Sequence, residues 1–325
     1  MMTAFNSYKK RREAIVIGPE SAPGTVATKQ YSFRWLDKGL KPIPGVLENE
    51  SAMGSDVKIN DSAIDLWHSE GPLGGKVTED GIGWLGTGMF SKVTTTAAGA
   101  QFKHVFSRDK TVARRTLSVW DVRPVSTRLY KSCYMDNLTV SLEVSEKGAW
   151  LEASTVLKGW KHEDTTGVTP AFKIGEKEFT SRQVEVFLAD DEAGLTAGKI
   201  KPKSISIQME EGTTVDHSIG EVNDDPEFDS APAEAKGSMV IKYRKTDYED
   251  GYFTNKIHAL KVVATNGTSK VEWLGTKVRF RELTDSDGRD DVVTQEISFY
   301  FEADENNAGK DIEMTVTNDV VSYAA

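Results

Sequence analysis

The sequence predicts a mainly β protein built from antiparallel strands. Most segments after residue 100 alternate apolar and polar residues with a period of two, as a sheet with one buried face requires. Asn266 and Gly267 separate two such segments, and Asn-Gly is a strong signal for a hairpin turn with positive φ at both central residues. No apolar run approaches the roughly 18 residues that a membrane-spanning helix needs, so we expect no membrane span.

The clearest strand lies at 137–144. Leu138, Val140 and Leu142 face one way there, and the residues between them are polar. A turn at 146–148 joins this strand to an antiparallel partner at 150–160. Further strands are expected at 101–107, 116–122, 205–209, 239–243, 259–265, 268–280, 292–302 and 312–316. The pairs 137–160 and 205–243 share a pattern that indicates a weak internal repeat.

The N-terminal quarter has a different composition. Prolines are concentrated there, at Pro19, Pro23, Pro42 and Pro44, so we expect arms and loops in place of long strands. We therefore predict an N-terminal arm at 1–17 and a β domain at 18–325, with an extended loop at about 39–55. A second loop, acidic and proline-containing, is predicted at about 221–235.

Two short helices are expected. The first lies near 79–90, with Thr78 available as the N-cap and with Glu79 and Asp80 at the positive end of the helix. The second is expected at 248–255. Glycines inside the first segment weaken its intrinsic preference for a helix.

Charge and cysteine content limit the function. The net charge is −10, which argues against a protein that grips nucleic acid, because phosphate binding needs clustered basic residues. The single cysteine, Cys133, excludes an intramolecular disulfide framework and fits synthesis in a reducing cytoplasm.

The segment 81–86 spells G-x-G-x-x-G, the glycine pattern of dinucleotide-binding folds. That motif needs a hydrophobic strand directly before it within a βαβ unit, whereas GPLGGKVTED precedes it here. We favour a helix that packs Trp84, Leu85 and Phe90 against the core.

Other candidate chemistry is weak. The histidines show no pair at metal-binding spacing and are His68, His104, His162, His217 and His258. Cys133 lacks the glycine-rich surroundings of a nucleophile, and we expect a small buried residue there. The segment 285–291 looks like a calcium loop, but its glycine is at position four and not six, so a solvated turn is favoured. We predict no catalytic, cofactor-binding or metal residue and no enzyme, although carboxylates distant in sequence can still converge in a fold.

The order of these landmarks resembles the tail tube protein, or major tail protein, of bacteriophages with long non-contractile tails. The similarity is collinear from about residue 15 to residue 320, and each of its motifs is short. It is carried by the segments 17–20, 24–27, 48–54, 80–85, 102–106, 136–159, 278–280 and 291–295.

The resemblance implies an antiparallel β-sandwich or barrel-like tail tube fold with a flanking short helix and extended loops or arms. It also implies a virion structural protein, made in the host bacterial cytoplasm, that self-assembles into hexameric rings. The rings would stack into a tube around a tape measure protein, between tail terminator and distal tail proteins. Phage DNA would pass through the lumen without specific binding, and no membrane would be involved.

A different class of function is a ligand-binding β-sandwich, such as a carbohydrate-binding module. Exposed tryptophans stack on sugars, and the candidates are Trp67, Trp150, Trp160 and Trp273. Tryptophans in a chain of this length more often pack in cores and interfaces. The tail tube protein is therefore the leading prediction.

Overall fold

A computed structural model describes residues 8–51, 54, 56–109, 111–219, 225–243, 247–286 and 292–324. Its N-terminal half contains β1 (Ala14–Pro19), β2 (Tyr31–Phe33), β3 (Trp35–Lys38), β4 (Lys41–Asn49), β5 (Asp61–Lys76), α1 (Gly81–Met89), β6 (Lys92–Ala98), β7 (Gln101–Ser107), β8 (Leu117–Val122), β9 (Thr127–Glu143), β10 (Glu152–Gly159) and β11 (Glu163–Thr165). Its C-terminal half contains β12 (Val184–Ala189), β13 (Lys199–Ile200), β14 (Ser204–Glu210), β15 (Thr213–Asp216), β16 (Glu227–Ser230), β17 (Glu234–Lys242), α2 (Asp247–Phe253), β18 (His258–Asn266), β19 (Ser269–Asp285), β20 (Thr294–Phe301) and β21 (Glu313–Asn318).

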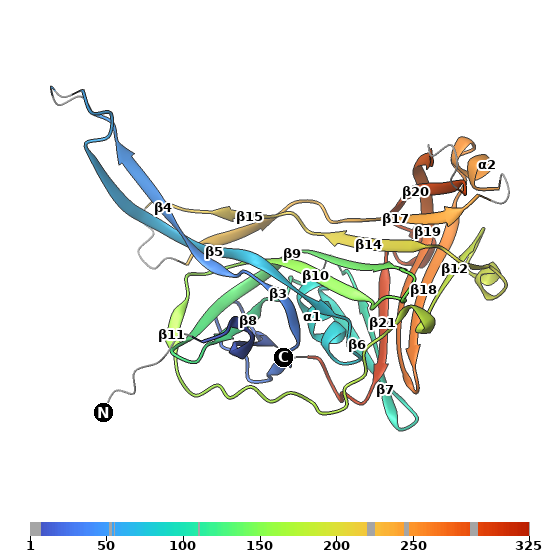
Figure 1. The fold of residues 1–325 in the computed structure, drawn as a ribbon, viewed down its shortest axis with the longest axis horizontal. Coiled ribbons are helices and arrows are strands. Elements are labelled where there is room, and N and C mark those ends of the chain that lie inside the picture. The colour runs from blue at the N-terminus through green and yellow to red at the C-terminus, as the bar shows by residue number, and fades with distance from the viewer. Residues whose placement is uncertain are drawn as a thin grey trace.

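The predicted fold class is confirmed, because the chain is mainly β and its strands pair antiparallel (Figure 1). Over the described residues, nineteen strands form one connected network, and β15 and β16 form a separate pair. The predicted hairpin of β9 and β10 is present, and β14 pairs with β17 as well as with β9. The strand pair that looked like a weak repeat therefore extends the same sheet.

Two long strands hold the network together by changing partners midway. Residues 127–133 of β9 pair with β8 and β11, whereas residues 134–143 pair with β10 and β14. At the crossing, Ser132 adopts a left-handed backbone with φ of 49°. Likewise β19 pairs with β21 through residues 270–274 and with β20 through residues 278–285. One continuous strand can thus belong to two layers.

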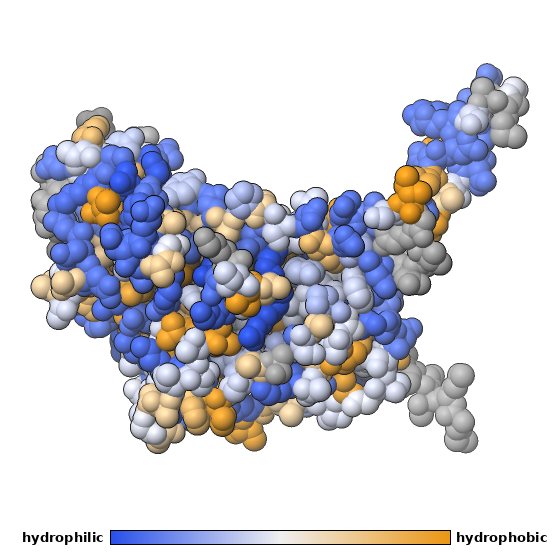
Figure 2. Space-filling model, turned by 180° about the vertical axis from the view of Figure 1, so that it is seen from behind, coloured by the Kyte–Doolittle hydropathy of each residue, from blue (hydrophilic) through white to orange (hydrophobic). Residues whose placement is uncertain are grey.

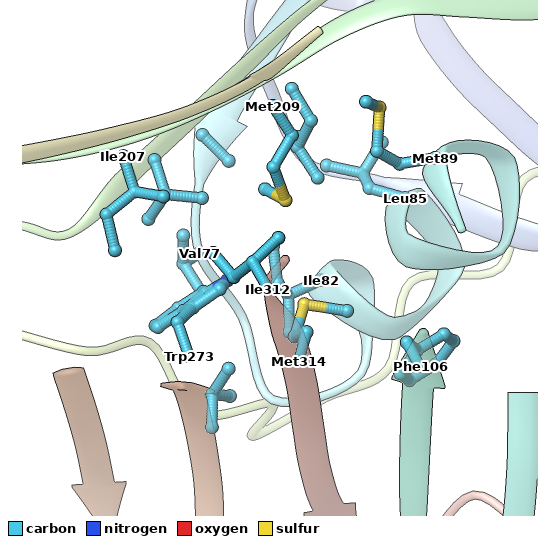
Figure 3. Close-up of a cluster of buried hydrophobic side chains, with 14 of the residues drawn as sticks. Val77, Ile82, Leu85, Met89, Phe106, Ile207, Met209, Trp273, Ile312 and Met314 are labelled. Carbon is cyan, nitrogen blue, oxygen red and sulfur yellow. The ribbon is translucent and has the colours of Figure 1, made fainter. Parts of the chain in front are cut away.

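Helix α1 lies inside the core between these layers (Figure 3). All nine of its residues are buried. Its glycines allow close contact: a Cβ on Gly83 would lie 2.2 Å from the Tyr323 ring, and one on Gly86 would lie 2.3 Å from Met314. The N-cap position is Asp80 and not the expected Thr78, because the helix begins at Gly81. The hydroxyl oxygen of Thr78 still accepts a hydrogen bond from the Gly81 amide at 3.0 Å. The G-x-G-x-x-G segment is therefore a packing helix, as the sequence indicated.

The predicted arm at 1–17 is wrong for its last residues, because β1 begins at Ala14 and is buried along its whole length. It is an interior strand between β2 and β8. Ile15 and Ile17 contact the main core, whereas Val16 packs with Trp120 on the other face. A continuous apolar run is typical of a strand covered on both faces, and this run was the missed signal. Residues 1–7 lie outside the described residues.

The predicted extended loop at 39–55 is also wrong in part. Residues 41–49 form β4, which pairs with β5 in a long hairpin that projects from the body (Figure 1). Pro42 and Pro44 do not prevent this, because within the described chain β4 pairs only with β5. An edge strand tolerates proline where the missing N–H faces away from its neighbour.

Other expectations are met with adjustments. Asn266 pairs with Ser269 across the predicted hairpin, so the turn residues are Gly267 and Thr268, and only Gly267 has positive φ. The second helix is present as α2. Within the predicted acidic loop at 221–235, residues 227–230 form β16 and β17 begins at Glu234; residues 221–224 lie outside the described residues.

Candidate assembly surface

The described residues between 44 and 66, in the distal part of the β4–β5 hairpin, are called the arm. Figure 1 shows the arm projecting at the upper left, away from the body. On one face of the arm, Val46 pairs with Ile64, and these side chains are 55% and 57% exposed. On the other face, Leu47 pairs with Ala63, and Leu47 is 56% exposed. The arm therefore presents apolar side chains that the subunit itself does not cover.

The arm is also acidic. Its sequence holds five carboxylates, at Glu48, Glu50, Asp56, Asp61 and Asp65, against one lysine, Lys58. Lys58 pairs with Glu50 at 2.9 Å. The cross-strand register puts Glu48 on the same face as Val46 and Ile64, and Asp61 on the same face as Leu47. Figure 2 shows the arm at the upper right with hydrophobic residues among hydrophilic ones.

A second feature is a basic groove at the opposite end of the molecule, beside α2. Its volume is about 800 Å³. Apolar side chains of β12, β13 and β17 line it, namely Leu188, Ile200 and Ile241. Five lysines also line it: Lys199, Lys201, Lys203, Lys242 and Lys256. The sequence carries a signal for this groove that we did not use, since three of its lysines fall in the five residues KIKPK at 199–203.

The electrostatics of the groove are unbalanced. Lys256 pairs with Asp190 at 2.8 Å, and Lys199 pairs with Glu185. Among the described residues, no acidic side chain lies within ion-pair distance of Lys201, Lys203 or Lys242. At the inner wall, burial lowers the pKa of the His258 imidazole, which stacks on a phenylalanine ring. The groove is therefore a positive patch on a chain whose net charge is negative.

A free sheet edge is a third candidate contact. Within the described chain β6 pairs only with β7, so its outer edge has unpaired N–H and C=O groups. The strand, KVTTTAA, is largely exposed. Such an edge can template pairing with a strand of another chain.

Candidate catalytic and metal-binding residues do not converge. Cys133 is fully buried, and burial raises the pKa of its thiol well above the usual range, which disfavours the reactive thiolate. The rings of His68 and His217 lie 6.3 Å apart, while His104 and His258 are buried in separate regions. In the part of the chain that the structure describes, no three His, Cys, Asp or Glu residues could hold one metal ion. The calcium-like segment 285–291 lies mostly outside the described residues.

The four tryptophans of the carbohydrate-binding alternative do not share one surface role. Trp273 is 1% exposed and lies in the core. Trp160 donates its indole N–H to the carbonyl of Pro226. Trp67 and Trp150 contact the ammonium groups of Lys161 and Lys76. The buried position of Trp273 removes it as a sugar contact.

Glu20 is a structural residue that the sequence reasoning missed. It is 3% exposed and accepts hydrogen bonds from the hydroxyls of Thr116 and Ser118, at 2.7 and 2.8 Å. It also accepts from the backbone N–H groups of Gly24 and Ser132, both at 3.0 Å. The carboxylate thus ties the loop after β1 to β8 and β9. No sequence pattern marked it, because its donors are spread over more than a hundred residues.

A projecting arm with exposed apolar side chains, a basic groove and an open sheet edge are surfaces typical of a structural protein that contacts other chains. The family is identified by comparison, since the model of the phage tail tube protein family matches residues 10–303. The chain belongs to this family. No curated protein matches the chain at a significant level.

Membership makes the protein a structural protein of the bacteriophage tail, located in the virion and associated with itself in the tail tube. The predicted resemblance to a phage tail tube protein is thereby confirmed. Over the described residues, no helix has both the length and the apolar character that a membrane crossing requires.

Proposed function

We propose that the protein self-assembles into hexameric rings and that these stack into the tube of a long, non-contractile tail. The observation that carries the proposal is the arm, where Val46, Leu47 and Ile64 are each more than half exposed. Exposed apolar side chains on a projecting hairpin have no function in the isolated subunit and are typical of a protein interface. The number of six subunits follows from the family resemblance.

The open edge of β6 and the elongated shape add support. An arm at one end and a groove at the other favour contacts of the head-to-tail kind, which close into rings or continue as helical stacks. Pairing of β6 with a neighbour would also remove an exposed edge that otherwise risks aggregation.

The tube would act as a passive conduit for the genome. A chain with a net charge of −10 repels phosphate groups, so DNA would slide through the lumen without adhering. A tape measure protein would set the tube length, and tail terminator and distal tail proteins would contact its two ends. These partners are inferred from the family, and binding them requires no catalytic residue in this chain.

Negative-stain electron microscopy of the purified protein at rising concentration tests self-assembly. We expect rings or tubes to replace monomers as the concentration increases. Monodisperse monomers at every concentration and salt condition, confirmed by analytical ultracentrifugation, would contradict the proposal.

A further inference from the structure

We propose that the arm of one subunit docks into the basic groove of another. This proposal rests on the proposed self-assembly and names the two surfaces that meet. Figure 1 places the arm and the α2 end at opposite ends of the longest axis, so the arm points away from the groove of its own chain. A second copy supplies the groove.

The groove offers two kinds of contact. Leu188, Ile200 and Ile241 provide an apolar floor, and exposed lysines surround it. Lys201 and Lys203 flank Pro202 in the short connection between β13 and β14, which holds both residues at the edge of the groove. An occupant must therefore combine apolar side chains with carboxylates.

The arm has this combination. Each of its faces carries an apolar cross-strand pair with a carboxylate nearby, Val46 and Ile64 with Glu48 on one face and Leu47 and Ala63 with Asp61 on the other. Docking would bury the apolar pairs and bring these carboxylates to lysines that lack an acidic partner among the described residues. Complementary charge of this kind fixes register and partner choice.

A nucleic-acid backbone fits the groove less well. Phosphates would use the lysines, but they would leave the apolar floor unpaired. The exposed apolar side chains of the arm would then also remain without a partner. A second copy of this chain satisfies both surfaces at once.

The docking is heterologous, because the two patches differ and lie far apart on the subunit. Each copy has one arm and one groove, so every docked subunit still offers a free arm or a free groove to the next. Such contacts generate closed rings or open helical stacks and do not stop at a dimer.

Compensating charge reversal tests the contact. The groove variant is Lys201→Glu/Lys203→Glu, and the arm variant is Glu48→Lys/Asp61→Lys. We expect each variant to raise the concentration needed for assembly more than tenfold. An equimolar mixture of the two would still contain mismatched pairs, so both changes are combined in one chain, where we expect assembly to be restored.

The matched control reverses two exposed lysines outside both surfaces, Lys9→Glu/Lys147→Glu. It changes the net charge by the same amount as the groove variant, and we expect assembly at the wild-type concentration. Circular dichroism and thermal unfolding show that each variant is folded, since all of the changed side chains are exposed or half-buried.

Cross-linking supplies an independent measurement. Ala63→Cys places a thiol on the arm, and Ala197→Cys places one in the groove. Both alanines are exposed in the structure. The native Cys133 is fully buried and does not compete. With a short bis-maleimide, we expect a covalent dimer in a mixture of the two variants and none in either variant alone.

The docking stands if the combined reversal restores assembly and the mixed cysteine variants cross-link. It is overturned if the wild-type chain forms tubes but the combined reversal does not restore assembly or the cysteine variants do not cross-link. The proposed self-assembly would still stand in that case. It falls together with the proposed function if the wild-type chain does not assemble. Loss of duplex DNA binding by Lys201→Glu/Lys203→Glu, with normal tube formation, would make the groove a nucleic-acid contact and would also overturn the docking.

Discussion

Helix α1 and the arm use similar residues for opposite purposes. In α1 every residue is buried, and each glycine lets a bulky neighbour come close. In the arm, Val46, Leu47 and Ile64 are apolar but exposed. The difference teaches that an apolar side chain contributes to folding only where the same chain supplies its cover. Where the same chain does not cover the side chain, the side chain can be buried only by contact with another molecule.

The free energies involved are comparable. Full burial of a valine, leucine or isoleucine side chain is worth about 1.5–3 kcal/mol relative to exposure. In α1 this contribution stabilises the monomer. In the arm it becomes available only when another surface covers the side chains, as the proposed docking would do.

The largest expected effect separates two tryptophans. Trp273 lies in the core near α1 at 1% exposed, whereas Trp150 is 42% exposed. We expect Trp273→Ala to lower the free energy of unfolding by about 3–5 kcal/mol through lost burial and a cavity. Trp150→Ala should cost less than about 1 kcal/mol. Urea denaturation measures both, and equal losses would contradict the division between core and surface.

A smaller effect concerns pH. His104 is fully buried; its Nε2 lies 2.8 Å from the Val320 carbonyl and its Nδ1 lies 2.9 Å from the Thr95 hydroxyl. The neutral ring with the proton on Nε2 suits both partners, because Nδ1 can then accept from the hydroxyl. Burial lowers the pKa of His104 below its ordinary value of 6.5.

The sign follows from proton uptake. Below pH 6.5 the unfolded chain binds a proton on this imidazole that the folded chain resists, so stability falls as the pH decreases through the lowered pKa. We expect His104→Gln to reduce this loss between pH 7 and pH 5. Thermal unfolding at several pH values measures it, and parallel curves for the variant and the wild type would argue against a role for His104.

The smallest effect on stability is expected in the arm. Val46→Ser/Ile64→Ser should change the free energy of unfolding by less than about 0.5 kcal/mol, because both side chains are already exposed. The same variant should fail to form tubes at concentrations where the wild type does. Denaturation and electron microscopy on one preparation check both statements. A marked loss of stability would show that the arm serves the fold.

Local patterns predicted much of the fold. Alternation at 137–144 with a turn near Gly148 indicated the β9–β10 hairpin, and Asn266-Gly267 indicated the β18–β19 hairpin. Thr78 indicated the start of α1. In each case the signal and the structure involve residues close together in the sequence.

Features that the sequence did not predict depend on residues far apart in the chain, or on prolines that a strand tolerates at a sheet edge. Pro42 and Pro44 argued for a loop, but an edge strand accommodates them. The apolar run of β1 is the local pattern of a buried strand, but its pairing with β8 joins residues far apart in the sequence. The basic groove joins the lysines at 199–203 to Lys242 and Lys256, and only the topology brings these residues together.

The prolines of β4 affect how unassembled subunits behave at high concentration. Proline in an edge strand places its ring nitrogen toward the open side, so the outer edge of β4 lacks two N–H donors and another strand cannot form a regular ladder along it. This would disfavour strand pairing between the hairpins of unassembled subunits. The hairpin would then keep the apolar side chains that bind its partner surface, while unassembled subunits would not aggregate through β4.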